Sequence, residues 1–115
     1  MIQRIHHQGK EIIYIDYRGL SDEAMHQTLF KMKDTVLEID KHHLRLVNVT
    51  GVSASARFRT EMRKIGKEIG HIPSKVAIVG LSASKKVVIN AYNQLIGGGM
   101  KLFDTENQAK EYLIA

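Results

Sequence analysis

The sequence predicts an α/β fold in which helices cover a mostly parallel β-sheet. Two β-branched runs separated by a turn open the chain, and short apolar runs then alternate with segments of helical periodicity. The short connections favour right-handed crossovers between parallel strands, while the opening hairpin adds an antiparallel element. With 115 residues, 43% hydrophobic and 25% charged, the chain suits one soluble globular domain spanning residues 1–115.

The first third of the chain predicts a hairpin followed by a long helix. Residues 2–5 and 11–17 have strand-forming compositions, and residues 7–10 supply the turn between them. Ser21 is a suitable N-cap for a helix that runs to about Asp40, because acidic residues follow it in the first turn. Spacings of three and four place five apolar side chains on one face of this helix: Met25, Leu29, Met32, Val36 and Ile39.

The stretch from Leu44 to Ser55 (LRLVNVTGVSAS) predicts a buried strand, a turn of small residues and the start of a second helix. That helix covers residues from Ser55 to Ile69, and Gly70 and Pro73 end it. Its predicted apolar stripe consists of Phe58, Met62, Ile65 and Ile69.

The last third predicts two more strands and two more helices. Residues 75–80 (KVAIVG) contain four consecutive apolar residues, typical of a strand covered on both faces, and residues 100–103 form a shorter strand. Ser82 or Ser84 caps the helix between them, the glycines at 97–99 end it, and Thr105 with Gln108 fits a capping box for the final helix. The side chains expected to face inward are Val88, Ala91, Tyr92 and Leu95, then Ala109, Tyr112 and Leu113. The prediction is thus a four- to five-stranded sheet with about four helices.

Composition narrows the classes of function. The chain has no cysteine, which excludes disulfides, thiolate catalysis and cysteine-ligated metal sites. It has neither an apolar run of membrane-spanning length nor a secretory signal pattern, so we expect a cytoplasmic protein. The net charge of +5 permits an acidic protein partner or peripheral contact with an anionic membrane. Few aromatic residues accompany the basic ones, so we expect no nucleic-acid partner.

The candidate site is a rim of small polar and basic residues where parallel strands end. Because the carboxyl ends of parallel strands meet at one edge of a sheet, the turns after three strands are expected to lie together there, with Asp104 and Thr105 further along. Amino ends of helices and lysines both favour an anion or an acidic partner loop. The rim consists of Thr50, Gly51, Ser53, Ser55, Arg57, Ser82, Ser84 and Lys85. The simpler interpretation of its serines and threonine is that they only cap helices.

The second predicted helix also carries a basic outer side. Arg57, Arg59, Arg63, Lys64 and Lys67 lie mostly off its apolar stripe. The simplest interpretation is that these residues form the solvent-exposed face of the helix, where such charge is common. The alternatives are contact with an acidic protein or with an anionic membrane surface, where each charge contributes on the order of 1 kcal/mol.

Two more specific chemical hypotheses, a nucleophile elbow and a histidine metal site, have weaker support. Residues 51–55 come within one residue of the Gly-x-Ser-x-Gly nucleophile elbow, but the chain is short for that scaffold and no histidine is placed to activate Ser53. The pairs His6-His7 and His42-His43 sit beside turns, where exposed histidine is common, and adjacent residues on a strand point to opposite faces. We therefore expect no catalytic residue, metal or cofactor.

The element order resembles that of the STAS domains, in particular the SpoIIAA-like branch typified by bacterial anti-sigma-factor antagonists. The resemblance covers almost the whole chain and rests on Asn48-Val49-Thr50-Gly51-Val52, where the family has a strand ending in an Asp-Leu-Ser-Gly-Val-like run. The tail Met100-Lys101-Leu102-Phe103-Asp104-Thr105, followed by Ala109 and Leu113, also matches. The resemblance implies a non-enzymatic switch in bacterial signalling, in which a partner kinase phosphorylates a serine and the phosphate breaks a protein–protein contact.

The chain departs from the family at the segment that carries this switch. The family's Asp-Ser-Ser-Gly-like segment is here Ser55-Ala56-Arg57-Phe58, so the usual acceptor position falls near Arg57, with Ser53 and Ser55 nearby. Divergent members of the fold are grouped with CRAL-TRIO-like lipid-binding domains, which would imply a carrier of a lipophilic or anionic small ligand. The expected function is a regulatory protein-binding module, the alternative is that carrier, and a small serine hydrolase is a distant third. Whether the domain forms a homodimer is open.

Overall fold

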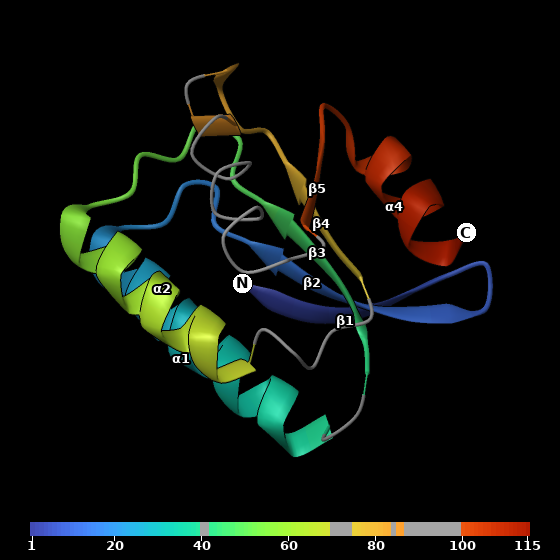
Figure 1. Cartoon of the computed structure of the whole chain (residues 1–115), viewed down its shortest axis with the longest axis horizontal. Helices are drawn as coiled ribbons and strands as arrows, with labels where there is room; N and C mark the ends of the chain where they lie inside the picture. Colours follow the sequence, from blue (N-terminus) through green and yellow to red (C-terminus); the bar gives the residue numbers. More distant parts are fainter. Residues whose placement is uncertain (40–41, 70–74, 84, 87–99) are drawn as a thin grey trace.

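The computed structural model describes residues 1–39, 42–69, 75–83, 85–86 and 100–115, and its centre is a five-stranded sheet (Figure 1). The strands are β1 (Ile2–His7), β2 (Lys10–Asp16), β3 (Leu44–Asn48), β4 (Lys75–Val79) and β5 (Met100–Phe103). The helices within the described ranges are α1 (Asp22–Ile39), α2 (Ala56–Ile69) and α4 (Glu106–Ile114). These elements confirm the predicted α/β class and mixed sheet.

The strands lie in the sheet in the same order as in the chain, β1-β2-β3-β4-β5. β1 pairs with β2 as an antiparallel hairpin, and the remaining neighbours are parallel. Gln8 and Gly9 form the hairpin turn with φ angles of 49° and 82°, which is the two-residue turn that matches the strand twist. The parallel strands all end at the same edge of the sheet, where the predicted rim begins.

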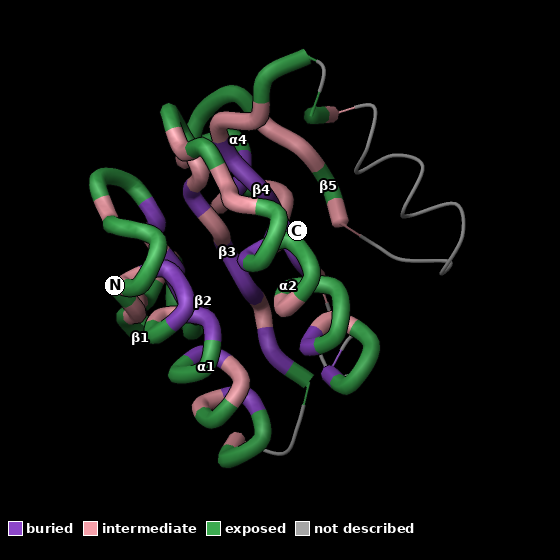
Figure 2. The backbone as a smooth tube through the Cα atoms, turned by 90° about the vertical axis from the view of Figure 1, so that its left-hand side faces the viewer, coloured by how far each residue is buried: buried purple, intermediate pink, exposed green. Residues whose placement is uncertain are grey.

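Helices cover both faces of the sheet. α1 and α2 lie side by side on one face, and α4 lies on the other (Figure 1). The first face packs Ile13, Ile15 and Tyr17 against the helices, and the second packs Ile12, Tyr14 and Leu46 against Ala109 and Leu113. Figure 2 shows buried positions concentrated on β2, β3 and β4, which therefore form the middle layer of the molecule.

The predicted apolar faces of the helices are largely confirmed. Met25, Leu29, Met32 and Val36 of α1 are buried, as are Phe58, Ile65 and Ile69 of α2 and Ala109 and Leu113 of α4. Met62 is the exception, because 39% of it is exposed although the sequence assigned it to the stripe of α2. Phe58, Ile65 and Ile69 pack in the core on this face of the sheet, whereas Met62 is not part of that cluster.

The predicted helix between β4 and β5 falls mostly outside the described residues. Ala83, Lys85 and Lys86 are helical, and the Lys86 amide donates to the Ser82 carbonyl at 2.9 Å, so a helix begins where the sequence placed it. Ser84, the inward-facing positions predicted between residues 88 and 95, and the glycines at 97–99 lie outside the described ranges.

Two polar side chains, one just before β3 and one on β3, are buried on the face of the sheet that α1 and α2 cover. His43 and Arg45 are each 8% exposed, and Arg45 Nε donates to His43 Nε2 at 3.3 Å. The prediction that His43 is exposed was therefore wrong, because His43 packs beside Arg45, which the register aligns with the buried residues Ile13 and Val76. Burial lowers the pKa of the Arg45 guanidinium to about 10.

No helix in the described part of the chain combines the length and the apolar character needed to cross a membrane.

Candidate functional site

The ends of β3, β4 and β5 meet at one edge of the sheet, as the sequence predicted (Figure 1). Beyond the strands, the Val49 amide donates to the Val79 carbonyl at 2.9 Å, and the Gly80 amide donates to the Phe103 carbonyl at 3.3 Å. Side chains connect the same turns, because Lys86 Nζ lies 3.2 Å from Asp104 Oδ1. The rim is thus a continuous surface formed by three consecutive strand ends.

Thr50 and Gly51 form the turn that leaves β3. Asn48 Oδ1 accepts hydrogen bonds from the Thr50 amide at 3.0 Å and from Thr50 Oγ1 at 2.8 Å, which closes a compact side-chain turn. Gly51 follows with a φ of 71°, in the left-handed region that favours glycine. The Thr50 hydroxyl is therefore committed to holding the turn.

Ser55 is committed to the start of α2. Its Oγ accepts from the Phe58 amide at 3.0 Å, which confirms the predicted N-cap. The same hydroxyl donates to Asp22 Oδ1 at 2.6 Å and so ties the first turn of α2 to the first turn of α1. For Thr50 and Ser55 the simpler interpretation, that they hold the local backbone, is the one the geometry favours.

Ser53 differs from its neighbours. It is exposed, and its hydroxyl makes no hydrogen bond to any residue in the described ranges. Lys85 lies close by, because its Nζ donates to the carbonyl of the preceding residue, Val52, at 2.6 Å. Arg57, in the first turn of α2, is also exposed. The structure thus brings a free serine hydroxyl, a lysine and the amino end of a helix to one part of the rim, where Ser82 is exposed as well.

The basic residues of α2 all point away from the core. Arg57, Arg59, Arg63, Lys64 and Lys67 are exposed. Arg59 donates to the Ala54 carbonyl at 3.3 Å, and Lys64 lies 3.9 Å from Glu61. Within the described ranges the other three have no hydrogen-bond or ion-pair partner. The basic outer side predicted for this helix is therefore present and largely uncompensated.

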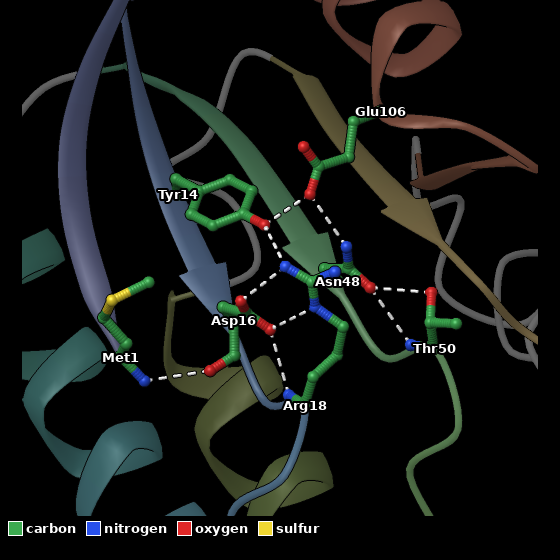
Figure 3. A network of polar contacts seen from close by, with 7 residues as sticks. All are labelled: Met1, Tyr14, Asp16, Arg18, Asn48, Thr50 and Glu106. Atoms are coloured by element: carbon green, nitrogen blue, oxygen red, sulfur yellow. Dashed lines mark hydrogen bonds and ion pairs between the residues drawn. The ribbon is translucent and has the colours of Figure 1, made fainter.

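Sequence reasoning missed a polar cluster beside the rim, on the face of the sheet that α4 covers (Figure 3). Tyr14 on β2 and Asn48 on β3 both donate to Glu106 Oε1 at the start of α4, the Asn48 bond measuring 2.8 Å. Arg18 binds Asp16 through Nε at 3.0 Å and Nη2 at 2.8 Å. The cluster fastens the final helix to two strands that are far from it in sequence.

The pKa values in this cluster reflect its hydrogen bonds. Burial raises the pKa of Tyr14 to about 12, and the hydrogen bond to Glu106 adds to that effect. For Glu106, burial alone would raise the pKa, but hydrogen bonds from Tyr14 and Asn48 outweigh it and hold the pKa below its usual value. Hydrogen bonds from Arg18 likewise lower the pKa of Asp16. Every charged member has a partner, so the cluster is a structural fastening and leaves no group poised for proton transfer.

The acidic and histidine side chains do not gather elsewhere into a chelating site. In the ranges that the structure describes, no group of three or more His, Asp or Glu side chains could hold a metal ion. His6 lies 3.8 Å from Glu11, His7 lies 3.5 Å from Glu111, and His43 is buried beside Arg45. Each of these histidines thus has its own separate surroundings.

Two shallow cavities lie at the opposite end of the sheet from the rim. Their volumes are about 310 and 360 Å³, and Arg4 and Ile39 line both. Most of the remaining lining side chains are polar: Thr35 and Glu38 in the first cavity, and Lys10, Glu11, His42 and His43 with Leu44 in the second. Such linings do not suit a lipophilic ligand.

Comparison with known proteins finds a likeness at the level of structure. No protein-family model matches the chain, and no curated protein matches it in sequence. The crystal structure of an uncharacterized protein of the DUF3478 family from Shewanella loihica, described as having a SpoIIAA-like fold, matches with a TM-score of 0.73. The match covers 98% of this chain and 92% of that one at 17% sequence identity. The strand order, the helices on both faces and this match together show that the chain has a SpoIIAA-like fold.

Proposed function

We propose that this chain is a non-enzymatic, STAS-like regulatory module that binds a partner protein through the rim and the basic side of α2. Its fold supports the proposal only in general terms, because one fold hosts many functions. The specific support comes from the exposed polar surface at the ends of three strands and from the uncompensated cations beside it. Partner binding is regulated by phosphate on Ser53.

The observation that carries the proposal is the contrast between Ser53 and the hydroxyls on either side of it. Thr50 holds the turn and Ser55 caps α2, whereas Ser53 is exposed and has no hydrogen-bond partner in the described ranges. A kinase can modify such a hydroxyl without breaking the fold. The family's usual acceptor position falls near Arg57, and Ser53 takes over the role of acceptor.

The surroundings of Ser53 explain how a phosphate would act. Phosphate carries a charge of about −2 and strong acceptor oxygens, and it is favoured near cations and the amino end of a helix. Lys85 is within reach of a phosphate on Ser53, because it already binds the carbonyl of the preceding residue, Val52. Arg57 lies in the first turn of α2. A phosphate at Ser53 neutralises these cations and withdraws them from an acidic partner.

The test compares Ser53→Asp with Ser53→Ala. We expect the aspartate to weaken partner binding about tenfold or more, because it places a negative charge where the partner's acids bind, and the alanine to leave binding unchanged. Binding is measured by pull-down from the host followed by titration of the purified partner, with circular dichroism to verify folding. Equal binding by both variants would show that the rim is not the contact surface.

Native mass spectrometry of protein purified gently from its host complements this test. A phosphate-sized increment that Ser53→Ala abolishes supports the regulatory proposal. A reproducible lipid-sized adduct would instead identify a carrier and contradict the proposed module.

A further inference from the structure

α1 exposes two large apolar side chains on its outer side. Phe30 is 45% exposed and Leu37 is 49% exposed, whereas the other large apolar residues of this helix face the core. They are seven positions apart, so they lie on one line along the helix, about 10 Å from each other. Two exposed apolar side chains at this spacing can pack against a partner helix that lies alongside α1, because apolar side chains of such a helix also recur seven positions apart.

Three contacts fix the register of α1 against α2. Asp22 binds Ser55 at 2.6 Å, the rings of His26 and Phe58 lie 5.5 Å apart, and Lys33 lies 2.5 Å from Glu68. The two helices run in the same direction because both return from parallel strands.

This register places the apolar anchors of α1 beside cations of α2. Phe30 is level with the turn that contains Lys64. Lys67 is level with the stretch of α1 between Phe30 and Leu37, and Leu37 lies at the level where α2 ends. Glu68 faces α1, and Lys64 lies four positions before it on the same side. Arg57 lies seven positions before Lys64, two turns back along the same line.

The charge on this side of α2 is mostly uncompensated. The helix carries five basic and two acidic residues. Arg57, Arg63 and Lys67 have no hydrogen-bond or ion-pair partner within the described ranges, and the exposed Lys64–Glu61 pair at 3.9 Å contributes little. Apolar anchors bordered by free cations on one edge are complementary to a helix with an apolar face and an acidic edge.

We propose that Phe30, Leu37, Arg57, Lys64 and Lys67 form a docking face for an acidic amphipathic helix of a partner protein. The apolar side chains of that helix pack on Phe30 and Leu37, and its acidic edge lies toward α2. This inference rests on the proposed function, since it names the class of partner and extends its contact surface from the rim along α1 and α2.

Charge argues against a second copy of this chain as the occupant. Two copies related by a twofold axis would bring their basic α2 helices together, and the chain already has a net charge of +5. A membrane fits less well than a helix. Asp34 and Glu38 are exposed on the side of the two anchors away from α2, and Met62 is the only large apolar residue of α2 that is exposed. An anionic bilayer would be repelled by Asp34 and Glu38, whereas a partner helix carries its own acids only on the edge that faces α2.

Site-specific photocrosslinking in the host tests the class of partner. Benzoylphenylalanine replaces Phe30 in the full chain, and the control carries it at Lys101, which is exposed on β5. We expect position 30, and not the control, to capture a protein whose crosslinked segment is acidic and has apolar residues at helical spacing. A crosslink to the chain itself, to lipid or to a segment without excess acid would overturn the inference, as would the absence of an adduct specific to position 30.

A peptide of the captured segment then tests the geometry by fluorescence anisotropy. Lys64→Glu should weaken binding about tenfold and reduce its salt dependence, and Phe30→Ser should weaken it about tenfold with the salt dependence unchanged. Lys101→Glu makes the same change in net charge away from the face and should alter binding less than about twofold. Equal effects of the two lysine variants would show unspecific attraction and overturn the proposed face.

The same measurements separate this inference from the function on which it rests. If Ser53→Asp weakens binding of the captured protein but Lys64→Glu and Phe30→Ser do not, the proposal of a regulatory module stands and the proposed α1–α2 docking face is wrong. If no protein is captured and neither set of changes affects any partner, both proposals fail.

Discussion

Gly80 shows how a single residue holds two strand ends together. Its φ is 91°, and a Cβ added there would lie 2.6 Å from Thr50 Cα and 2.7 Å from the Thr50 amide nitrogen. Only glycine permits this approach between the turn after β3 and the end of β4. The rim therefore depends on a residue that contributes no side chain to it.

Replacing Gly80 by alanine should cost much more than the same change at Gly51. We expect Gly80→Ala to lower the free energy of unfolding by about 3 kcal/mol or more, because steric overlap with backbone adds to an unfavourable φ. Gly51→Ala should cost about 1 kcal/mol, since its φ is 71° but nothing lies within 4 Å of the new Cβ. Denaturant unfolding of both variants measures the difference. Similar losses would mean that Thr50 does not lie against Gly80.

Because of Glu106, the free energy of unfolding should depend on pH in the acidic range. Its folded pKa lies below its usual value of 4.5, so the carboxylate stabilises the fold above pH 4.5, and that contribution is lost as the pH falls through the folded pKa. Glu106→Gln should cost about 1 kcal/mol at pH 7 and flatten the stability profile below pH 4.5. Denaturation at several pH values measures this, with Glu111→Gln, on the exposed side of α4, as the control. A profile of Glu106→Gln parallel to the wild type would contradict the role of the Tyr14–Asn48–Glu106 bonds.

Among the described elements, α4 covers the second face of the sheet. Leu113 is 1% exposed and packs in the cluster that contains Ile12, Tyr14 and Leu46. Leu113→Ala should therefore lower the free energy of unfolding by about 3 kcal/mol. Leu37→Ala, at a site 49% exposed on α1, should change it by less than about 0.5 kcal/mol. Thermal unfolding of the two variants separates the covering helix from the exposed face, and equal losses would show that Leu37 is also part of the core.

The elements that sequence reasoning predicted well are those defined by local chemistry. Ser21, Ser55 and Thr105 all cap helices as expected, accepting from the amides of Ala24, Phe58 and Gln108. An N-cap needs only a hydroxyl and the amide three positions later, so a short stretch of sequence contains the whole signal.

The features that sequence reasoning missed depend on distant parts of the chain. Tyr14 and Glu106 are 92 positions apart, so no local pattern indicates their contact. The only available signal was that a strand end and the first turn of the last helix would share one edge. Arg45 is buried because the register aligns it with Ile13 and Val76, which a local sequence pattern does not reveal.

The whole molecule is layered about β3. This strand has a hydrogen-bonded neighbour on each side, and helices lie over both faces of the sheet (Figure 1). We expect its amides to exchange hydrogen most slowly of all the described elements, and those of β1, an edge strand with one neighbour, to exchange faster. Hydrogen–deuterium exchange followed by mass spectrometry measures this. Equal protection of β1 and β3 would mean that the sheet opens only as a unit.

The strands lie in the sheet in the same order as in the chain, and this order affects how the sheet forms during synthesis. After the opening hairpin, each new strand pairs with the strand completed just before it, so none has to be inserted between two that are already paired. Each parallel pair still joins segments that a long stretch of chain separates, so sheet growth requires loop closure, which slows the folding of parallel sheets. During synthesis, the growing chain can extend its sheet in one direction, one strand at a time. The last helix then closes the second face by fastening itself to strands that formed near the beginning.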